Sequence, residues 1–221
     1  MLVIILLCLL MGPPVIVCGF LHYVTYGWNS SAQALILFLL VNTLICLWEL
    51  VLYYKYDRIH NKHTKRIKDN FYTTQPQSED FIFVQDVPIT KAFCPDLWSQ
   101  IWIDYGYYDP SYADKTTFGF NIDVGNGHST LLPSLLMAVS IISPIFSAKV
   151  TGMLGMLLFY QTWYGTVVYF FSYVNCGRYL KSAWSDIGVV LFANCIWIVF
   201  PVLGFYCSVK LIMEESFACL Q

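Results

Sequence analysis

Charged side chains are scarce in this chain of 221 residues: Asp, Glu, Lys and Arg together make up only 12% of it. A soluble domain carries about 25% charged residues, so this chain cannot cover its whole surface with polar groups. Hydrophobic residues make up 57% of the chain, and the mean hydropathy is +0.59. We therefore expect an integral membrane protein.

An excess of positive charge is also missing, because the formal net charge is −2. There is no basic stripe with interleaved aromatic residues, so nucleic acid is not an expected partner. The eight cysteines form no CxxC or Cys/His spacing, and we expect neither a metal site nor a cofactor. Cys94 and Cys176 lie outside the apolar segments and would pair only if their loops faced an oxidising lumen.

The chain instead contains several apolar segments, most of them near the length of about 20 residues that a membrane helix needs. They predict an all-α fold, a polytopic bundle of about five transmembrane helices. The first segment contains Pro13 and Pro14 but no basic start, which favours a retained, kinked helix over a cleaved signal peptide. The five segments are Leu2–Tyr26, Ala32–Tyr54, Leu131–Phe146, Val150–Val174 and Ile187–Met213.

One long polar loop, 57–130, separates an N-terminal helix pair, 1–56, from a C-terminal three-helix bundle, 131–221. Inside this loop the spacing of apolar residues predicts a short amphipathic helix that begins at Pro95 or Asp96 and ends at Gly106. Such a helix can lie at the membrane interface as a lid over the bundle. Gly125-Asn126-Gly127 is expected to be a turn before the third apolar segment.

The loop opens with a run of basic residues, which favours the cytoplasmic side of the membrane and would place the C-terminus outside. The run consists of Lys55, Arg58, Lys62, Lys65, Arg66 and Lys68. The Asn29-Ser30-Ser31 glycosylation sequon would then face the lumen. It lies close to the membrane, so an unmodified turn is the favoured interpretation.

Ionisable groups at membrane depth are functional candidates by default. Glu49 fits this description, although it could face either the bundle interior or the interface. His22 stands alone near the end of the first segment, where a hydrogen-bonded structural role is more common than ligand binding. In the fourth segment the polar groups of Gln161, Tyr164 and Thr166 need partners inside the bundle.

The fifth segment places Asn194, Trp197 and Pro201 on one helical face. Pro201 removes a hydrogen bond and leaves the carbonyl near Trp197 free beside the Asn194 amide. The result would be a polar spot in an apolar pocket, suited to a sterol or an aminated lipid. The alternative is a packing kink that neighbouring helices stabilise.

These residues resemble a known family. The runs Tyr164-Gly165-x-x-x-Tyr169-Phe170 and Asn194-x-x-Trp197-x-x-x-Pro201 look like the last two helices of EXPERA-domain proteins, which include sterol isomerases and the sigma-two receptor. The segment from Leu97 to Tyr112 resembles the loop before that family's third core helix. The resemblance implies a membrane protein of the endoplasmic reticulum or another organelle.

Family isomerases use a histidine and two glutamates, and this chain departs from that set. Tyr26 stands where one glutamate would be, and the segment Leu131–Phe146 contains no acid. With Glu49 as the one candidate carboxylate, no catalytic residue is expected. The family also keeps its C-terminus cytosolic, which disagrees with the orientation that the basic run predicts.

The main hypothesis is a non-catalytic EXPERA-like protein that binds a sterol or membrane lipid in its helix bundle. One alternative is an accessory subunit of a larger respiratory or photosynthetic membrane complex, with other membrane subunits or a second copy as partners. A second alternative is a sterol Δ8–Δ7 isomerase that uses Glu49 and His22. The candidate ligand-binding residues are Glu49, Gln161, Tyr164, Thr166, Tyr169, Asn194 and Trp197, with His22 as a further candidate.

Overall fold

The computed structural model describes residues 1–69 and 81–221, and within them the chain is all helical. One isolated β-bridge joins Leu2 to Asp86 and is the only extended pairing in the described part. The α-helices are α1 (Val3–Tyr26), α2 (Ser30–Tyr54), α3 (Tyr56–Lys68), α4 (Pro95–Tyr108), α5 (Phe118–Ile142), α6 (Ala148–Asn175) and α7 (Trp184–Glu214).

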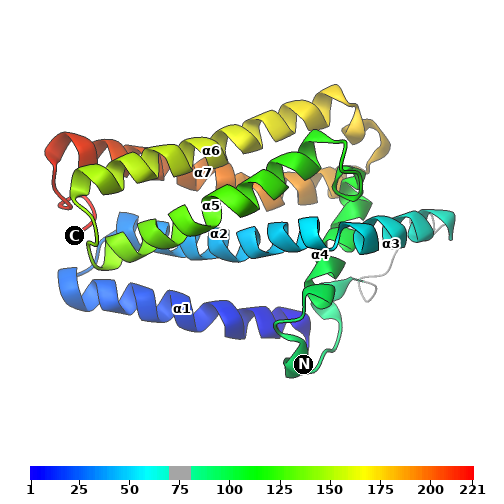
Figure 1. Ribbon diagram of the computed structural model, residues 1–221, viewed down its shortest axis with the longest axis horizontal. Coiled ribbons are helices and arrows are strands. Elements are labelled where there is room, and N and C mark those ends of the chain that lie inside the picture. Colours follow the sequence, from blue (N-terminus) through cyan, green and yellow to red (C-terminus); the bar gives the residue numbers. More distant parts are fainter. Residues whose placement is uncertain (70–80) are drawn as a thin grey trace.

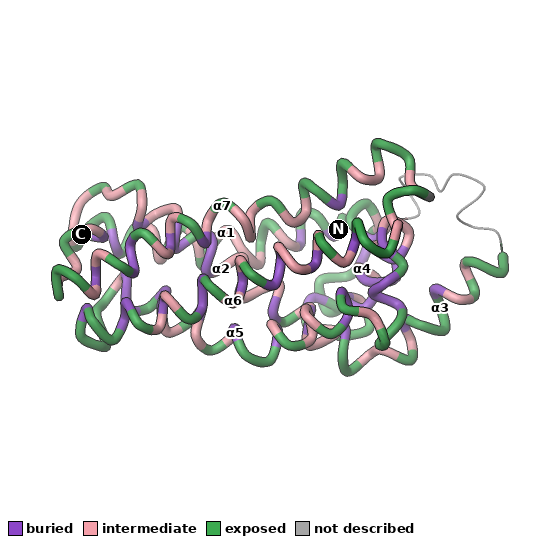
Figure 2. The backbone as a smooth tube through the Cα atoms, turned by 90° about the horizontal axis from the view of Figure 1, so that it is seen from above, coloured by how far each residue is buried: buried purple, intermediate pink, exposed green. Residues whose placement is uncertain are grey.

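Five long helices, α1, α2, α5, α6 and α7, run along the long axis of the molecule (Figure 1). The shorter α4 crosses them at one end, and α3 continues outward from the end of α2 (Figure 1). The N-terminus lies at the end that carries α4, whereas the C-terminus lies at the opposite end (Figure 1). Much of α3 is exposed, while buried residues gather where the long helices face one another (Figure 2).

Three of the described helices, α1, α2 and α7, are long and apolar enough to cross a membrane. This agrees with an integral membrane protein, but the expected number of five spans is not confirmed. The helices α5 and α6 fall short because they carry more polar side chains, such as Asp123 and Asn126 in α5 and Gln161 in α6.

The third apolar segment belongs to a helix that starts much earlier than the sequence suggested. Helix α5 begins at Phe118, where the Thr117 side chain caps it by accepting a hydrogen bond from the Phe120 amide at 3.3 Å. The expected turn at Gly125-Asn126-Gly127 is wrong, since these residues lie inside α5. Gly127 is needed for close packing instead, because a methyl group there would lie 2.7 Å from Glu49 Cβ on α2.

The basic run forms helix α3 instead of a loop, and two ion pairs fix it to α4. Lys55 Nζ lies 2.9 Å from Asp96 Oδ1, and Arg66 Nη1 lies 2.7 Å from Asp104 Oδ1. Helix α4 starts at Pro95, as expected, but it continues past Gly106 to Tyr108. Gly106 lies inside the helix, where a Cβ atom would come within 2.6 Å of the His63 ring of α3.

Two further expectations concern the proline and cysteine residues. Helix α1 remains continuous through Pro13 and Pro14. All eight cysteines are free, so the conditional pairing of Cys94 with Cys176 is not present.

Small residues bring α6 and α7 together at the C-terminal end of the bundle. Methyl groups added at Gly152 or Gly204 would lie 2.7 Å from the Ser208 carbonyl oxygen and 2.5 Å from the Phe159 ring, respectively. Close approach through small residues is typical of helix pairs in membranes, where apolar burial provides little driving force. This tight end of the bundle contrasts with the α4 end, where a cavity opens.

Candidate functional site

A cavity of about 500 Å³ lies where α4 crosses the bundle. Its inner walls come from α2, α5 and α7, and its cover comes from α4 and the segment 81–84. Aromatic rings dominate the lining. They belong to Trp48, Phe81, Phe83, Trp102, Tyr105, Tyr108, Tyr112 and Trp197. The volume falls within the range of roughly 300–1,000 Å³ that is usual for small-molecule sites.

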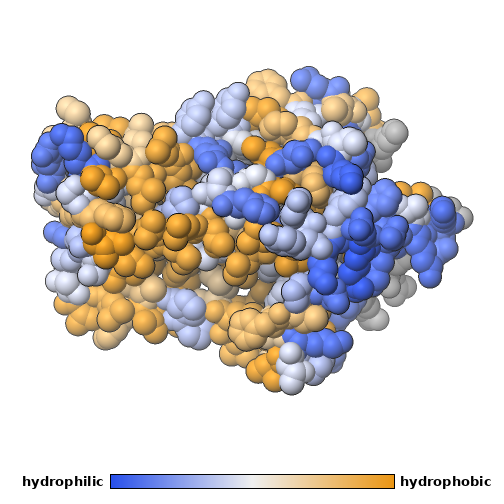
Figure 3. All heavy atoms as spheres, in the orientation of Figure 1, coloured by the Kyte–Doolittle hydropathy of each residue, from blue (hydrophilic) through white to orange (hydrophobic). Residues whose placement is uncertain are grey.

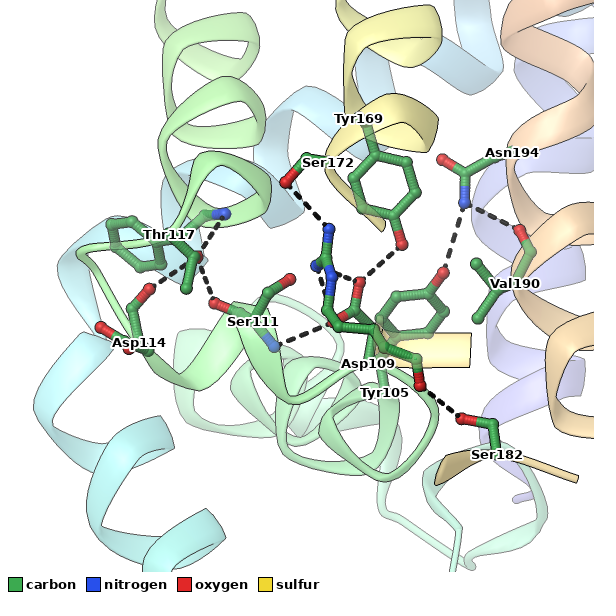
Figure 4. A network of polar contacts seen from close by, with 12 residues as sticks. Tyr105, Asp109, Ser111, Asp114, Thr117, Tyr169, Ser172, Ser182, Val190 and Asn194 are labelled. Atoms are coloured by element: carbon green, nitrogen blue, oxygen red, sulfur yellow. Dashed lines mark hydrogen bonds and ion pairs between the residues drawn. The ribbon is translucent and has the colours of Figure 1, made fainter. Parts of the chain in front are cut away.

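The Asn194 amide supplies one polar group of the cavity. Its Nδ2 donates to the Val190 carbonyl at 2.9 Å and to the Tyr105 hydroxyl at 3.3 Å, as Figure 4 shows. The amide therefore faces inward. It is held by Val190 and Tyr105 rather than by the carbonyl near Trp197 that the proline was expected to free.

Tyr105 belongs to a network centred on the fully buried carboxylate of Asp109 (Figure 4). Asp109 Oδ2 accepts a hydrogen bond from the Tyr169 hydroxyl at 2.7 Å and lies 2.8 Å from Arg178 Nη1. The Ser111 amide donates to Asp109 Oδ1 at 3.0 Å. These contacts connect the end of α4 to α6 and the loop after it, and they fix one wall of the cavity.

A second series of hydrogen bonds lies behind the Trp197 side of the cavity. The Trp197 indole donates to Asn42 Oδ1 at 2.7 Å, and Asn42 Nδ2 donates to the Ser134 hydroxyl at 2.9 Å. One turn along α2, Cys46 Sγ lies 3.1 Å from the Thr130 hydroxyl. Trp197 is thus held in one orientation by α2 and α5, so its ring forms a fixed wall.

Two carboxylates approach this region from α2 and α5. Asp123 lines the cavity, and Glu49 lies in the bundle next to Cys46 with 6% of its surface exposed. The charges of Glu49 and Asp123 interact, and Glu49 Oε2 has no hydrogen-bond partner among the described residues. Of the two placements left open for Glu49, the structure shows the inward one.

Asp123 was missed by the sequence analysis. The Gly-Asn-Gly run was interpreted as a turn, which placed Asp123 in a loop and left the third segment without an acid. The Thr117 cap and the apolar residues after it would have extended the helix to Phe118. That extension would have placed the carboxylate at the level of the cavity.

Burial affects the acid–base properties of the tyrosines at this site. It raises the pKa values of Tyr105 and Tyr112, and nearby carboxylates raise them further. Both hydroxyls therefore stay protonated at neutral pH. They remain able to donate hydrogen bonds to an acceptor.

The candidate residues of α6 lie elsewhere. Tyr164 stacks on Tyr160 with 50% of its surface exposed, so it points away from the cavity. Gln161 donates to Asn126 of α5, and the Thr166 hydroxyl bonds the Thr162 carbonyl within its own helix. Tyr169 acts indirectly through Asp109. Of the expected ligand-binding residues, only Asn194 and Trp197 line the cavity. The others, which do not line it, are Glu49, Gln161, Tyr164, Thr166 and Tyr169.

His22 lies near the opposite end of the bundle from α4. Its Nε2 is 2.6 Å from the Leu220 carbonyl oxygen, and its Nδ1 is 3.4 Å from Gln33 Nε2. The imidazole thus secures the C-terminal segment to α1 and α2, which is a structural role. Within residues 1–69 and 81–221, no three His, Cys, Asp or Glu side chains gather as a metal site would require.

Comparisons of the chain with models of protein families, with curated proteins and with solved structures find no match. The resemblance to EXPERA-domain proteins therefore stays a prediction.

Proposed function

We propose that this protein binds a sterol-like membrane lipid in the cavity beneath α4. The observation that carries the proposal is the combination of broad aromatic walls with few polar side chains. Of these, Asp104 is bonded to Arg66 and to the Ile82 amide, whereas Asn194 and Asp123 both lie near Tyr105. A flat apolar ring system fits between aromatic faces, and a single hydroxyl or amine at its end would meet the amide and the carboxylate.

The cover of the cavity supports the same proposal. Phe81, Phe83 and Val84 line it beside α4, and the Ile82 amide donates to Asp104 Oδ2 at 2.7 Å. This hydrogen bond holds the segment against α4, so that apolar side chains lie between the cavity and the solvent. A lipid can stay bound under such a cover because its rings remain out of water.

Binding of a fluorescent sterol such as dehydroergosterol tests the proposal. Asn194→Leu removes the amide and should weaken binding about tenfold, the effect of losing about 1.4 kcal/mol. Tyr164→Phe changes an exposed ring on α6 and serves as the matched control. Equal affinity of all three proteins would contradict the assignment, and so would equal weakening by both substitutions.

A second candidate function is a proton-transfer reaction on the bound lipid, such as the shift of a double bond. The sequence argument against catalysis counted only one carboxylate, whereas Asp123 and Glu49 are close enough for their charges to interact. A proton shuttle needs a donor and an acceptor within reach of the substrate. Asp123 lines the cavity and would be the group that contacts the lipid, whereas Glu49 lies behind the lining and would act through Asp123.

Turnover of a Δ8 sterol by the purified protein decides between binding alone and catalysis. If the pair is catalytic, Asp123→Asn should abolish turnover while Tyr164→Phe leaves it unchanged. Sterol binding without turnover would leave the protein a binder.

A further inference from the structure

A second cavity, of about 390 Å³, lies on the other side of Trp48 from the aromatic cavity. Its walls are α1, with Met11 and Pro14, and α2, with Leu44 and Leu47; the start of α4 closes one end through Trp98. Figure 3 shows the apolar surface of this side of the molecule, hollowed between α1 and the rest of the bundle. We propose that this cavity binds the acyl chain of a bilayer phospholipid.

The polarity of the lining selects the occupant. The Thr43 hydroxyl is bonded to the Leu39 carbonyl at 2.8 Å, and the Trp98 indole is bonded to the Ala92 carbonyl at 2.8 Å. The remaining lining side chains are apolar apart from the indole N–H of Trp48, which also borders the first cavity. A hydrocarbon chain can therefore cover the Thr43 and Trp98 groups without breaking a hydrogen bond, and it brings no polar group that needs a partner in the cavity.

The position of the cavity gives it access to bilayer lipid. Both α1 and α2 are long and apolar enough to cross a membrane, and only 11% of the most apolar stretch of α1 is buried within the protein. Helix α1 therefore presents most of its surface to lipid. A groove between these two helices lies at the depth of the acyl chains and must be filled by hydrocarbon, since water there would face apolar walls.

The end of the groove near α4 suits a phospholipid headgroup. Phe93 lines the groove with 87% of its surface exposed, which is favourable for an aromatic ring at the membrane interface. Lys91 is exposed two residues earlier and would attract a phosphate group. The indole N–H of Trp48 is buried without a partner among the described residues, so it does not contribute to this end of the groove.

Retention of a brominated phospholipid tests this inference on the full chain. The protein is purified in detergent with dibrominated phosphatidylcholine, moved to lipid-free detergent and analysed by native mass spectrometry. Bromine also quenches tryptophan fluorescence at short range, so Trp98 reports a lipid that lies in the groove. We expect one retained lipid per chain, and less quenching in Trp98→Phe.

Thr43→Phe fills the groove and should lower retention at least fivefold. Leu37→Phe enlarges a residue of the same helix that is 42% exposed and should leave retention unchanged. If Thr43→Phe fails to fold, Met11→Phe fills the groove from α1 and carries the same expectation. The inference is overturned if the filled variants retain as much lipid as Leu37→Phe, or if the groove retains dehydroergosterol in place of phosphatidylcholine.

The outcome is independent of the proposed sterol site. Thr43→Phe should leave dehydroergosterol binding in the aromatic cavity unchanged, whereas Asn194→Leu should leave phospholipid retention unchanged. Loss of both ligands in either variant would overturn the assignment of two separate sites.

Discussion

The Asp109–Arg178 ion pair offers the sharpest test of how the cavity wall is held. Asp109 is fully buried, and the Arg178 side chain is only 12% exposed. Arg178 Nη1 lies 2.9 Å and 2.8 Å from the two carboxylate oxygens. Arg178→Met would leave the Asp109 charge buried without its main partner.

The structure allows the magnitude to be worked out. Removal of one partner of a buried pair costs about 3–5 kcal/mol, because the remaining charge stays out of water. Tyr169→Phe removes one hydrogen bond to the same carboxylate and should cost about 1.5–3 kcal/mol. The double variant Asp109→Leu with Arg178→Met removes both charges and should be more stable than Arg178→Met alone.

Thermal unfolding of the purified protein in one detergent provides the measurement. A chain of this size loses about 2–4 °C in unfolding midpoint for each kcal/mol, so Arg178→Met should unfold about 10 °C below the parent protein. An Arg178→Met midpoint within 1 °C of the parent, or a double variant less stable than Arg178→Met, would refute the reasoning. An unchanged midpoint would mean that the ion pair does not stabilise the cavity wall. A less stable double variant would mean that the burial of the unpaired Asp109 charge is not what destabilises Arg178→Met.

Three further predictions concern other parts of the molecule. Burial lowers the pKa of His63 to about 4, so between about pH 6.5 and pH 4 the unfolded chain binds a proton that the folded chain does not. The free energy of unfolding should therefore fall by about 3 kcal/mol across that window, and His63→Leu should remove this part of the pH dependence. Gly204→Ala places a methyl group 2.5 Å from a neighbouring phenyl ring and should cost about 1–3 kcal/mol, whereas Gly188→Ala in the same helix meets open space and should be neutral or stabilising, as thermal unfolding of both variants would show. Asn42→Leu leaves the Trp197 indole without its acceptor and should cost about 1–3 kcal/mol by the same assay. A loss of stability below 0.5 kcal/mol in Gly204→Ala or Asn42→Leu would contradict the contact behind that prediction. A fall below 0.5 kcal/mol between pH 6.5 and pH 4 would contradict the burial of His63.

Composition and periodicity were sufficient to predict a helical membrane protein and to place the start of one helix at Pro95 or Asp96; it begins at Pro95. These features follow from local chemistry, since apolar runs form helices in lipid and proline fits the first turn. The N-terminal part of α5 was missed because Gly127 was interpreted as a turn residue, whereas it allows α5 to pack closely on α2. A sequence does not distinguish a glycine that forms a turn from a glycine that lets a neighbouring helix approach. In this chain the position of α2 makes the distinction.

The candidate site was predicted in part for a similar reason. Asn194 and Trp197 line the cavity, and they share a helical face, which the sequence shows directly. Tyr164 faces outward instead, because a tyrosine hydroxyl can find hydrogen-bond partners at the surface as well as inside the bundle. The choice between the two depends on where α5 lies, and no pattern within α6 contains that information.

The two cavities differ in polarity although Trp48 borders both of them. The first lining contains the Asn194 amide and the Asp123 carboxylate, whereas in the second the Thr43 hydroxyl and the Trp98 indole are bonded to backbone carbonyls. Under the two proposals, a lipid with a polar end would bind beneath α4 and a hydrocarbon chain would bind beside α1. If both proposals hold, the ring of Trp48 separates two lipids that differ in whether they carry a polar group into the protein.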